Sequence, residues 1–212
     1  MYAGPVADAD SHDTIAQETR HRTKVERSLF IGIAFPVSTD DAFFTGLAAI
    51  AKEHFDATHH CWAFRLEAGG EIRARSSDAG EPSGTAGKPI LNAIESAALT
   101  DVAVVVVRYY GGVKLGTGGL ARAYRQCAAE TLGRSRRERT YLYERFEIDA
   151  PFHAMSAIYR MISPPEVLLV SEEFGETNRF TLDVRHSRAE RIEQELVERR
   201  IRFVRSPKHR FD

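Results

Sequence analysis

The chain has 212 residues, of which 43% are hydrophobic and 28% charged, and its formal net charge is -1. This composition is sufficient for one large or two small packed domains, and it excludes a disordered chain and a uniformly basic protein that binds polyanions through total charge. The two cysteines, Cys61 and Cys127, are far apart and form no C-x-x-C pair, so we expect a reduced, cytoplasmic protein without disulfides. No apolar run approaches membrane-spanning length.

The first half of the chain alternates between strand and helix patterns. Residues 1–20 are polar and acidic, and we expect them to form a flexible tail. The periodic segments that follow are a strand at 28–35, a helix that starts at Asp40, a hairpin of 58–66 and 72–75 that turns at Gly69-Gly70, and a helix near Pro89. The unbroken apolar run at 102–107 predicts a strand that is buried on both faces.

A glycine-rich loop follows this strand and leads into a helix that we expect to run from near Gly118 to Gly133. The first N–H groups of a helix have no partner within the helix, and the helix dipole is positive there, so a loop of this kind suits an anion. The residues expected to bind an anion or nucleic acid are Lys88, Arg108, Lys114, Gly116, Thr117, Gly118 and Gly119, with Thr117 as the helix cap. The alternative is that the glycines are purely structural, because glycine is also the residue that adopts the positive φ angles of a sharp turn most readily.

A long loop at 76–86 precedes the helix near Pro89. Its polar residues and a nearby histidine predict a cleft formed by His60, Asp78, Glu81, Ser83 and Thr85. Gly87-Lys88 is followed by proline where a P-loop has Ser or Thr, which argues against a nucleotide triphosphatase. His59 and Cys61 lack further converging ligands, so we expect no metal and no cofactor.

The remainder of the chain has the element order β-α-β-β-α-β, which is typical of a ferredoxin-like domain. We place the domain boundary in the basic connector at 133–140, so the expected domains span 21–135 and 141–212. Ser187 and Glu190 match a capping box at the start of the second helix. A basic patch that could contact RNA is expected from Arg199, Arg200, Arg202 and Arg205.

Three motifs resemble the signatures of the YigZ/IMPACT family: R-Y-Y-G-G-V-K-L-G-T-G-G-L at 108–120, S-D-A-G-E-P-S-G-T-A-G-K-P-I-L at 77–91 and T-H-H-C-W-A-F at 58–64. The resemblance implies an α+β protein. Its N-terminal domain would resemble domain 2 of the fifth protein of the small ribosomal subunit, and its ferredoxin-like C-terminal domain would resemble domain V of elongation factor G. Where family members carry a second acid after the position of Asp78, this chain has Ala79, which weakens a two-carboxylate mechanism.

The eukaryotic branch of the family regulates translation, so the resemblance implies a binding protein linked to translation. We expect RNA or a ribosome-associated protein as its partner, no contact with a membrane, and no catalytic residue. The sequence leaves the oligomeric state open. The alternative is a hydrolase or phosphotransferase in which Asp78, Glu81 and His60 converge in one cleft.

Overall fold

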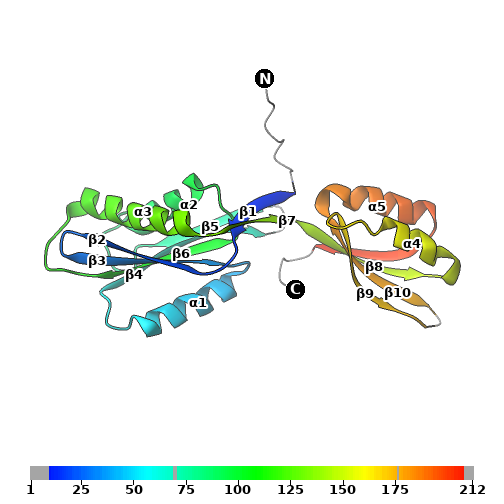
Figure 1. Ribbon diagram of the computed structural model, residues 1–212, viewed down its shortest axis with the longest axis horizontal. Coiled ribbons are helices and arrows are strands. Elements are labelled where there is room, and N and C mark those ends of the chain that lie inside the picture. The colour runs from blue at the N-terminus through cyan, green and yellow to red at the C-terminus, as the bar shows by residue number, and fades with distance from the viewer. Residues whose placement is uncertain (1–9, 69–70, 176, 208–212) are drawn as a thin grey trace, which may run out of the picture. The chain divides into compact units, whose positions relative to one another are not determined.

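The computed structural model describes residues 10–68, 71–175 and 177–207. Its contacts divide the chain into two compact units (Figure 1). The first unit comprises residues 12–139, and the second comprises residues 140 onward together with the chain up to Ser11. Each unit combines an antiparallel sheet with helices, and the predicted α+β class with two domains is confirmed.

The first unit is built on a five-stranded sheet with helices on both faces. Figure 1 shows α2 and α3 on one face of this sheet and α1 on the other. The strands lie in the order β2 (Thr19–Val25), β3 (Ser28–Pro36), β6 (Val102–Tyr109), β4 (His59–Ala68) and β5 (Glu71–Ser77), and every neighbouring pair is antiparallel. The helices are α1 (Asp40–Glu53), α2 (Gly87–Ser96) and α3 (Gly116–Arg134).

Strand β6 is the centre of this sheet and is buried on both faces, as its apolar run predicts. Val104 and Val106 pack in the cluster under α2 and α3, whereas Val105 and Val107 pack with Phe43 of α1. The neighbours of β6 are antiparallel, so its continuous apolar run reflects helices on both faces of the sheet and not a parallel arrangement. Arg108, the polar residue that ends this run, therefore lies at the edge of the buried core.

The second unit has the ferredoxin-like order of elements. They are β8 (Tyr143–Ala150), a 3-10 turn (Phe152–Ala154), α4 (Met155–Met161), β9 (Val167–Glu173), β10 (Asn178–Arg185), α5 (His186–Glu198) and β11 (Arg202–Pro207). The sheet order β11-β8-β10-β9 places the first and third strands of the unit in the centre. Their alternating residues Phe146, Ile148, Phe180 and Leu182 are fully buried beneath the two helices.

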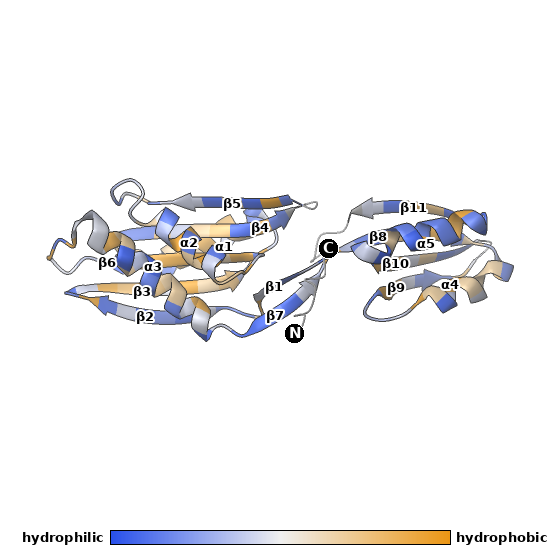
Figure 2. Cartoon of the chain, turned by 90° about the horizontal axis from the view of Figure 1, so that it is seen from above, coloured by the Kyte–Doolittle hydropathy of each residue, from blue (hydrophilic) through white to orange (hydrophobic). Residues whose placement is uncertain are grey.

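The prediction of a flexible tail is wrong for residues 10–20. Strand β1 (Ser11–Ile15) and the start of β2 lie there, and β1 pairs with β7 (Arg137–Tyr141), which occupies much of the predicted connector. Figure 2 shows β2 and β7 mostly in hydrophilic colours, so these strands lack the apolar alternation that reveals a strand in a sequence. Residues 1–9 of the predicted tail and the turn at 69–70 lie outside the described residues.

Main-chain and side-chain contacts with distant residues hold β1 in place. Thr100 N donates to the Asp13 carbonyl oxygen at 2.9 Å, and His12 Nε2 lies 2.7 Å from Asp101 Oδ2. The boundary between the two units crosses both strands: it lies between Ser11 and His12 in β1 and between Arg139 and Thr140 in β7. Separate folding of the two units stays a prediction.

The predicted capping box at α5 is also wrong, because an aspartate from the start of the chain takes its place. Helix α5 begins at His186 without a side-chain cap from its own N-cap residue. Instead Asp10, which is fully buried, accepts hydrogen bonds from Ser187 N at 3.0 Å and from Arg185 Nη2 at 2.7 Å. Burial raises the pKa of Asp10, but the hydrogen bonds from Arg185 and Ser187 outweigh that effect and lower the pKa to about 2.

Candidate anion-binding site

The loop between β6 and α3 needs glycine at three of its positions. A Cβ on Gly111 would lie 1.9 Å from the carbonyl oxygen of Arg27, so only glycine allows this close approach of two backbones. Gly112 and Gly116 have φ angles of 84° and 70°, a region that side chains other than glycine rarely adopt. The loop therefore serves a structural turn in addition to any role in binding.

The first turn of α3 begins at Gly116 and receives no side-chain cap from its N-cap residue, Leu115. Thr117 lies inside the helix, so its predicted role as the cap is wrong. Gly116, Thr117 and Gly118 are exposed, and three of the first four helical residues are glycines. The backbone N–H groups of this turn are consequently open to a ligand from outside the chain.

Exposed cations lie at the starts of two helices of this unit. Lys114 precedes α3 by two residues, and Lys88 lies in the first turn of α2. Arg122 was not among the predicted site residues, yet its Nη1 lies 3.7 Å from the position of a Cβ on Gly118. The spacing of four residues on one helix, which puts Gly118 and Arg122 on the same face, is the signal that could have revealed it.

Arg108 does not belong to this exposed group, and the predicted role of Arg108 as a cation open to ligands is corrected here. Its side chain is only 6% exposed, and its Nη1 donates to Glu81 Oε1 at 2.6 Å. Its Nη2 donates to Ser28 Oγ at 3.3 Å, and the guanidinium lies 5.4 Å from the ring centroid of Phe30. Arg108 is thus a buried partner of Glu81, with one nitrogen, Nε, that has no hydrogen-bond partner among the described residues.

Glu81 is the centre of a buried polar network that joins three elements. Tyr124 Oη of α3 donates to Glu81 Oε1 at 2.8 Å, and Cys61 Sγ of β4 lies 3.3 Å from Tyr124 Oη. Burial raises the pKa of Tyr124, and burial raises the pKa of the Cys61 thiol to about 12. Both groups are therefore neutral at pH 7, and Cys61 has none of the thiolate character that a nucleophile needs.

Asp78 organises the 76–86 loop by accepting hydrogen bonds from its backbone. Gly84 N donates to Oδ2, and Ala86 N and Gly87 N donate to Oδ1, each at 2.8 Å. Burial raises the pKa of Asp78, but the three N–H donors outweigh it and hold the pKa below its usual range. Thr85 is buried and its Oγ1 donates to the Pro82 carbonyl oxygen at 2.6 Å, so this loop is stabilised largely by its own hydrogen bonds.

The residues of the predicted catalytic cleft do not converge on one another. Asp78 is engaged by the loop amides, Glu81 by Arg108 and Tyr124, and His60 Nε2 lies 3.0 Å from the carbonyl oxygen of His54. Ser83 is exposed on the same loop. The histidine near Glu81 is His59, whose Nε2 lies 3.9 Å from Glu81 Oε1.

The four C-terminal arginines do not share one face. Arg202 is opposite Asp149 in the ladder of β11 and β8, whereas Arg205 is opposite Phe146, so the two point to opposite sides of the sheet. Arg199 pairs with Glu195 at 3.0 Å. Arg200, with a φ of 57°, forms the turn after α5. These positions correct the prediction of a single basic patch.

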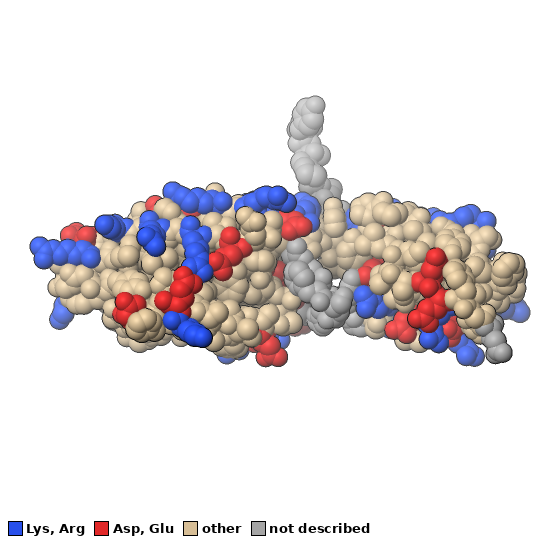
Figure 3. All heavy atoms as spheres, turned by 60° about the horizontal axis from the view of Figure 1, so that its bottom comes forward, with Lys and Arg blue, Asp and Glu red and all other residues tan. Residues whose placement is uncertain are grey.

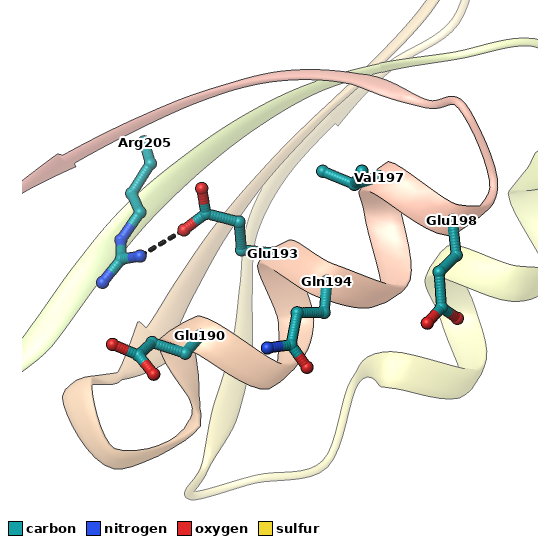
Figure 4. A pocket seen from close by; sticks show the side chains of 6 residues that line it. All are labelled: Glu190, Glu193, Gln194, Val197, Glu198 and Arg205. Atoms are coloured by element: carbon teal, nitrogen blue, oxygen red, sulfur yellow. Dashed lines mark hydrogen bonds and ion pairs between the residues drawn. The ribbon is translucent and has the colours of Figure 1, made fainter.

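The groove beside α5 and β11 is mainly acidic. Figure 4 shows Arg205 turned toward Glu193, and Arg205 is also paired with Glu144. The groove has a volume of about 440 Å³ and is lined by Glu190, Glu193, Gln194, Val197, Glu198 and Arg205.

Figure 3 shows Lys and Arg side chains interspersed with Asp and Glu on the face in view, in both units.

These observations define a class: an α+β protein of two domains whose first domain carries a glycine-rich, uncapped helix start beside exposed cations. A family model described as the Impact N-terminal domain matches residues 26–132. The chain belongs to the IMPACT family. Among the described residues, no helix is both long and apolar enough to cross a membrane.

Several curated relatives carry the family name. An IMPACT family member of Haemophilus influenzae is 36% identical over 155 residues, which are 72% of this chain and 74% of that protein. YvyE of Bacillus subtilis is 40% identical over 122 residues, 58% of this chain and 56% of the relative. YigZ of Escherichia coli is 30% identical over 152 residues, 71% of this chain and 74% of the relative.

A solved structure supports the fold over almost the whole chain. A crystal structure described as that of a hypothetical protein covers 95% of this chain and 98% of its own, with 25% identity and a TM-score of 0.69. The translational regulator Yih1, described as a two-domain protein, covers 63% of this chain and 49% of its own with 23% identity. Its TM-score of 0.36 is too low to support an argument about fold or function.

Proposed function

We propose that this protein is a non-catalytic binding protein associated with translation, and that it holds a phosphate group of its partner at the start of α3. The link to translation rests on membership of the IMPACT family, whose eukaryotic branch regulates translation. The partner that fits this proposal is RNA or a ribosome-associated protein, because both present phosphate or acidic groups to a cationic surface.

The observation that carries the proposal is the exposed first turn of α3. Its N–H groups have no side-chain cap, and Gly116, Gly118 and Gly119 allow an anion to approach the backbone closely. Lys114 and Arg122 add two full positive charges to the partial charge of the helix dipole. Arg108 is not part of this binding surface, because its charge is neutralised by Glu81 inside the unit.

The internal pairing of the buried polar groups favours binding over catalysis. A catalytic carboxylate needs access to substrate, whereas Glu81 already accepts hydrogen bonds from Arg108 and Tyr124. The second candidate remains a hydrolase or phosphotransferase, and the 3.9 Å separation of His59 Nε2 and Glu81 Oε1 is the geometry that favours it. Turnover of a phosphate ester that is lost in His59→Gln would establish this second candidate.

The test of the binding proposal is the double variant Lys114→Ala/Arg122→Ala, titrated with a short single-stranded RNA at several salt concentrations. Each cation that contacts a phosphate contributes to the salt dependence, so affinity and the slope of log K against log salt should both fall. The matched control is Lys52→Ala/Arg134→Ala, which also removes two exposed charges from the first unit but away from the loop. Equal losses in the two double variants would reject the α3 site and leave only nonspecific charge attraction.

A further inference from the structure

A hollow lined by cationic side chains lies in the ferredoxin-like unit, between α4 and α5. It has a volume of about 150 Å³, and three arginines line it: Arg160 of α4 and Arg188 and Arg191 of α5. Ile192 of α5 is buried and contributes an apolar wall. The hollow is independent of the α3 loop, because all its residues belong to the second unit.

The ion pairs around this hollow leave it with an excess of positive charge. The two carboxylates that line it already form ion pairs, Glu166 with Arg188 at 2.9 Å and Glu195 with Arg199 at 3.0 Å. Arg160 and Arg191 form no ion pair within the part of the chain that the structure describes. Two guanidinium groups from two different helices therefore line one small hollow without an ion pair of their own among the described residues, while the two carboxylates of the lining are paired with other arginines.

Ser163 adds a hydroxyl group at the end of α4. Its Oγ donates to the Met161 carbonyl oxygen at 3.3 Å, which is a long hydrogen bond for a hydroxyl donor. Ser163 lines the same hollow as the arginines. Its hydroxyl group can therefore turn toward an acceptor bound between the two helices at little cost.

We propose that this hollow binds the phosphate group of a small phosphorylated metabolite. A phosphate dianion matches the charge of Arg160 and Arg191, and its oxygens suit the planar, two-pronged donors of guanidinium groups. The volume of about 150 Å³ admits a phosphate group and little more, so the rest of the ligand lies outside the hollow. A nucleic acid is a poorer match, because its successive phosphates require an extended row of cations and not one recess between two helices.

The experiment is an amide chemical-shift titration of the full chain with inorganic phosphate, with ionic strength held constant by chloride. Saturable shifts are expected at the amides of Arg160, Ser163 and Arg191. The variant Arg160→Gln/Arg191→Gln should weaken phosphate binding about tenfold or more, because it removes two charged hydrogen-bond donors. Both side chains are exposed and lack a described partner, so the variant should keep the melting temperature of the wild type.

Two control variants test whether phosphate binds at this hollow and not elsewhere on the chain. Arg179→Gln/Arg202→Gln removes two exposed arginines from the sheet of the same unit and should leave phosphate binding unchanged. Lys114→Ala/Arg122→Ala should also leave these shifts unchanged, so failure of this site and failure of the α3 site are distinguishable. Equal phosphate affinity in wild type and Arg160→Gln/Arg191→Gln would overturn the proposal.

A comparison of free phosphoserine with a phosphoserine peptide tests the class of ligand. Binding of free phosphoserine at least as tightly as inorganic phosphate supports a small metabolite. Binding of the peptide alone would overturn the proposal in favour of a phosphorylated protein partner.

Discussion

Arg108 Nη1 donates to Glu81 Oε1 at 2.6 Å, and both side chains lie inside the first unit. Arg108 lies near the end of the central strand β6, and Glu81 belongs to the loop before α2. The ion pair therefore joins the two glycine-rich motifs of the family across 27 positions of sequence. The charges of these two residues are used within the fold, which is why the proposed binding site relies on the exposed cations around α3 instead.

Removal of one partner of this pair should destabilise the first unit strongly. Glu81→Gln leaves the buried guanidinium without its carboxylate, and losses of this kind cost about 3–5 kcal/mol of unfolding free energy. Arg108→Met combined with Glu81→Gln should cost less than the sum of the two single changes, because no uncompensated charge remains. The measurement is urea unfolding followed by the fluorescence of Trp62, the one tryptophan of the chain. A loss below about 1 kcal/mol in Glu81→Gln would contradict the pairing.

Both thiols should be unreactive in the native protein. Burial raises the pKa of Cys61 to about 12 and that of Cys127 to about 11, so the thiolate that reacts is scarce at pH 8. A colorimetric thiol reagent should react with neither cysteine in the native protein and with both after unfolding in guanidinium. Rapid reaction of one thiol without a denaturant would show that it is accessible and would reopen the case for a nucleophile.

Asp10→Asn should destabilise the second unit, because it removes the carboxylate that pairs with the buried Arg185 and accepts from Ser187. Breaking a buried pair of this kind costs about 3–5 kcal/mol. Hydrogen exchange at the amides of β10 and α5 should accelerate. The control Asp13→Asn affects a partly exposed carboxylate 3.9 Å from Arg139 and should change stability by less than about 1 kcal/mol.

The effect of Asp10 should depend on pH in a defined direction. Its folded-state pKa is lowered from 3.8 to about 2, so its contribution to stability is fully present above pH 4 and is lost as the pH falls toward 2. The stability difference between wild type and Asp10→Asn should accordingly shrink between pH 4 and pH 2. A difference that stays constant over this range would show that the carboxylate charge is not what stabilises the unit.

Gly118→Ala should test whether this glycine serves the fold or the ligand. A Cβ at this position would meet only Arg122 Nη1, at 3.7 Å, and the residue is exposed within α3. Alanine favours a helix by about 0.8–1.0 kcal/mol over glycine, so the stability of the first unit should rise or stay the same. The affinity for single-stranded RNA should fall if the glycine is there for close approach of an anion. A clear loss of stability would show that glycine is required by the turn itself.

The two units should differ in their ability to fold alone. The piece 12–139 contains its complete core and should unfold cooperatively. The piece 140–212 lacks Asp10, so it should be less stable than the same unit within the full chain, by an amount similar to that of Asp10→Asn. Calorimetry of both pieces measures this difference, and a fully stable 140–212 piece would contradict the role of Asp10.

The sequence by itself determined the elements whose burial follows a local period. The run at 102–107 predicts a strand covered on both faces, and the alternation around Phe146 and Phe180 predicts the ferredoxin-like order. Apolar periodicity is a short-range signal that is independent of which distant segment supplies the partner. The glycine motifs that identify the family are local for the same reason, since most of their glycines are required by a positive φ angle or by the close approach of another backbone or side chain.

Only the tertiary structure decided the partners of the polar residues. Arg108 looks like an exposed cation in the sequence, yet it pairs with Glu81, and Glu81 lies near His59 and not His60. Asp10, at the start of the chain, supplies the acceptor for α5 that Ser187 was expected to provide. Strands β1 and β7 are mostly polar, and they pair with each other although they lie at opposite ends of the sequence of the first unit. An ion pair or an edge strand depends on where a distant part of the chain returns, and that return is set by the packing of the whole core.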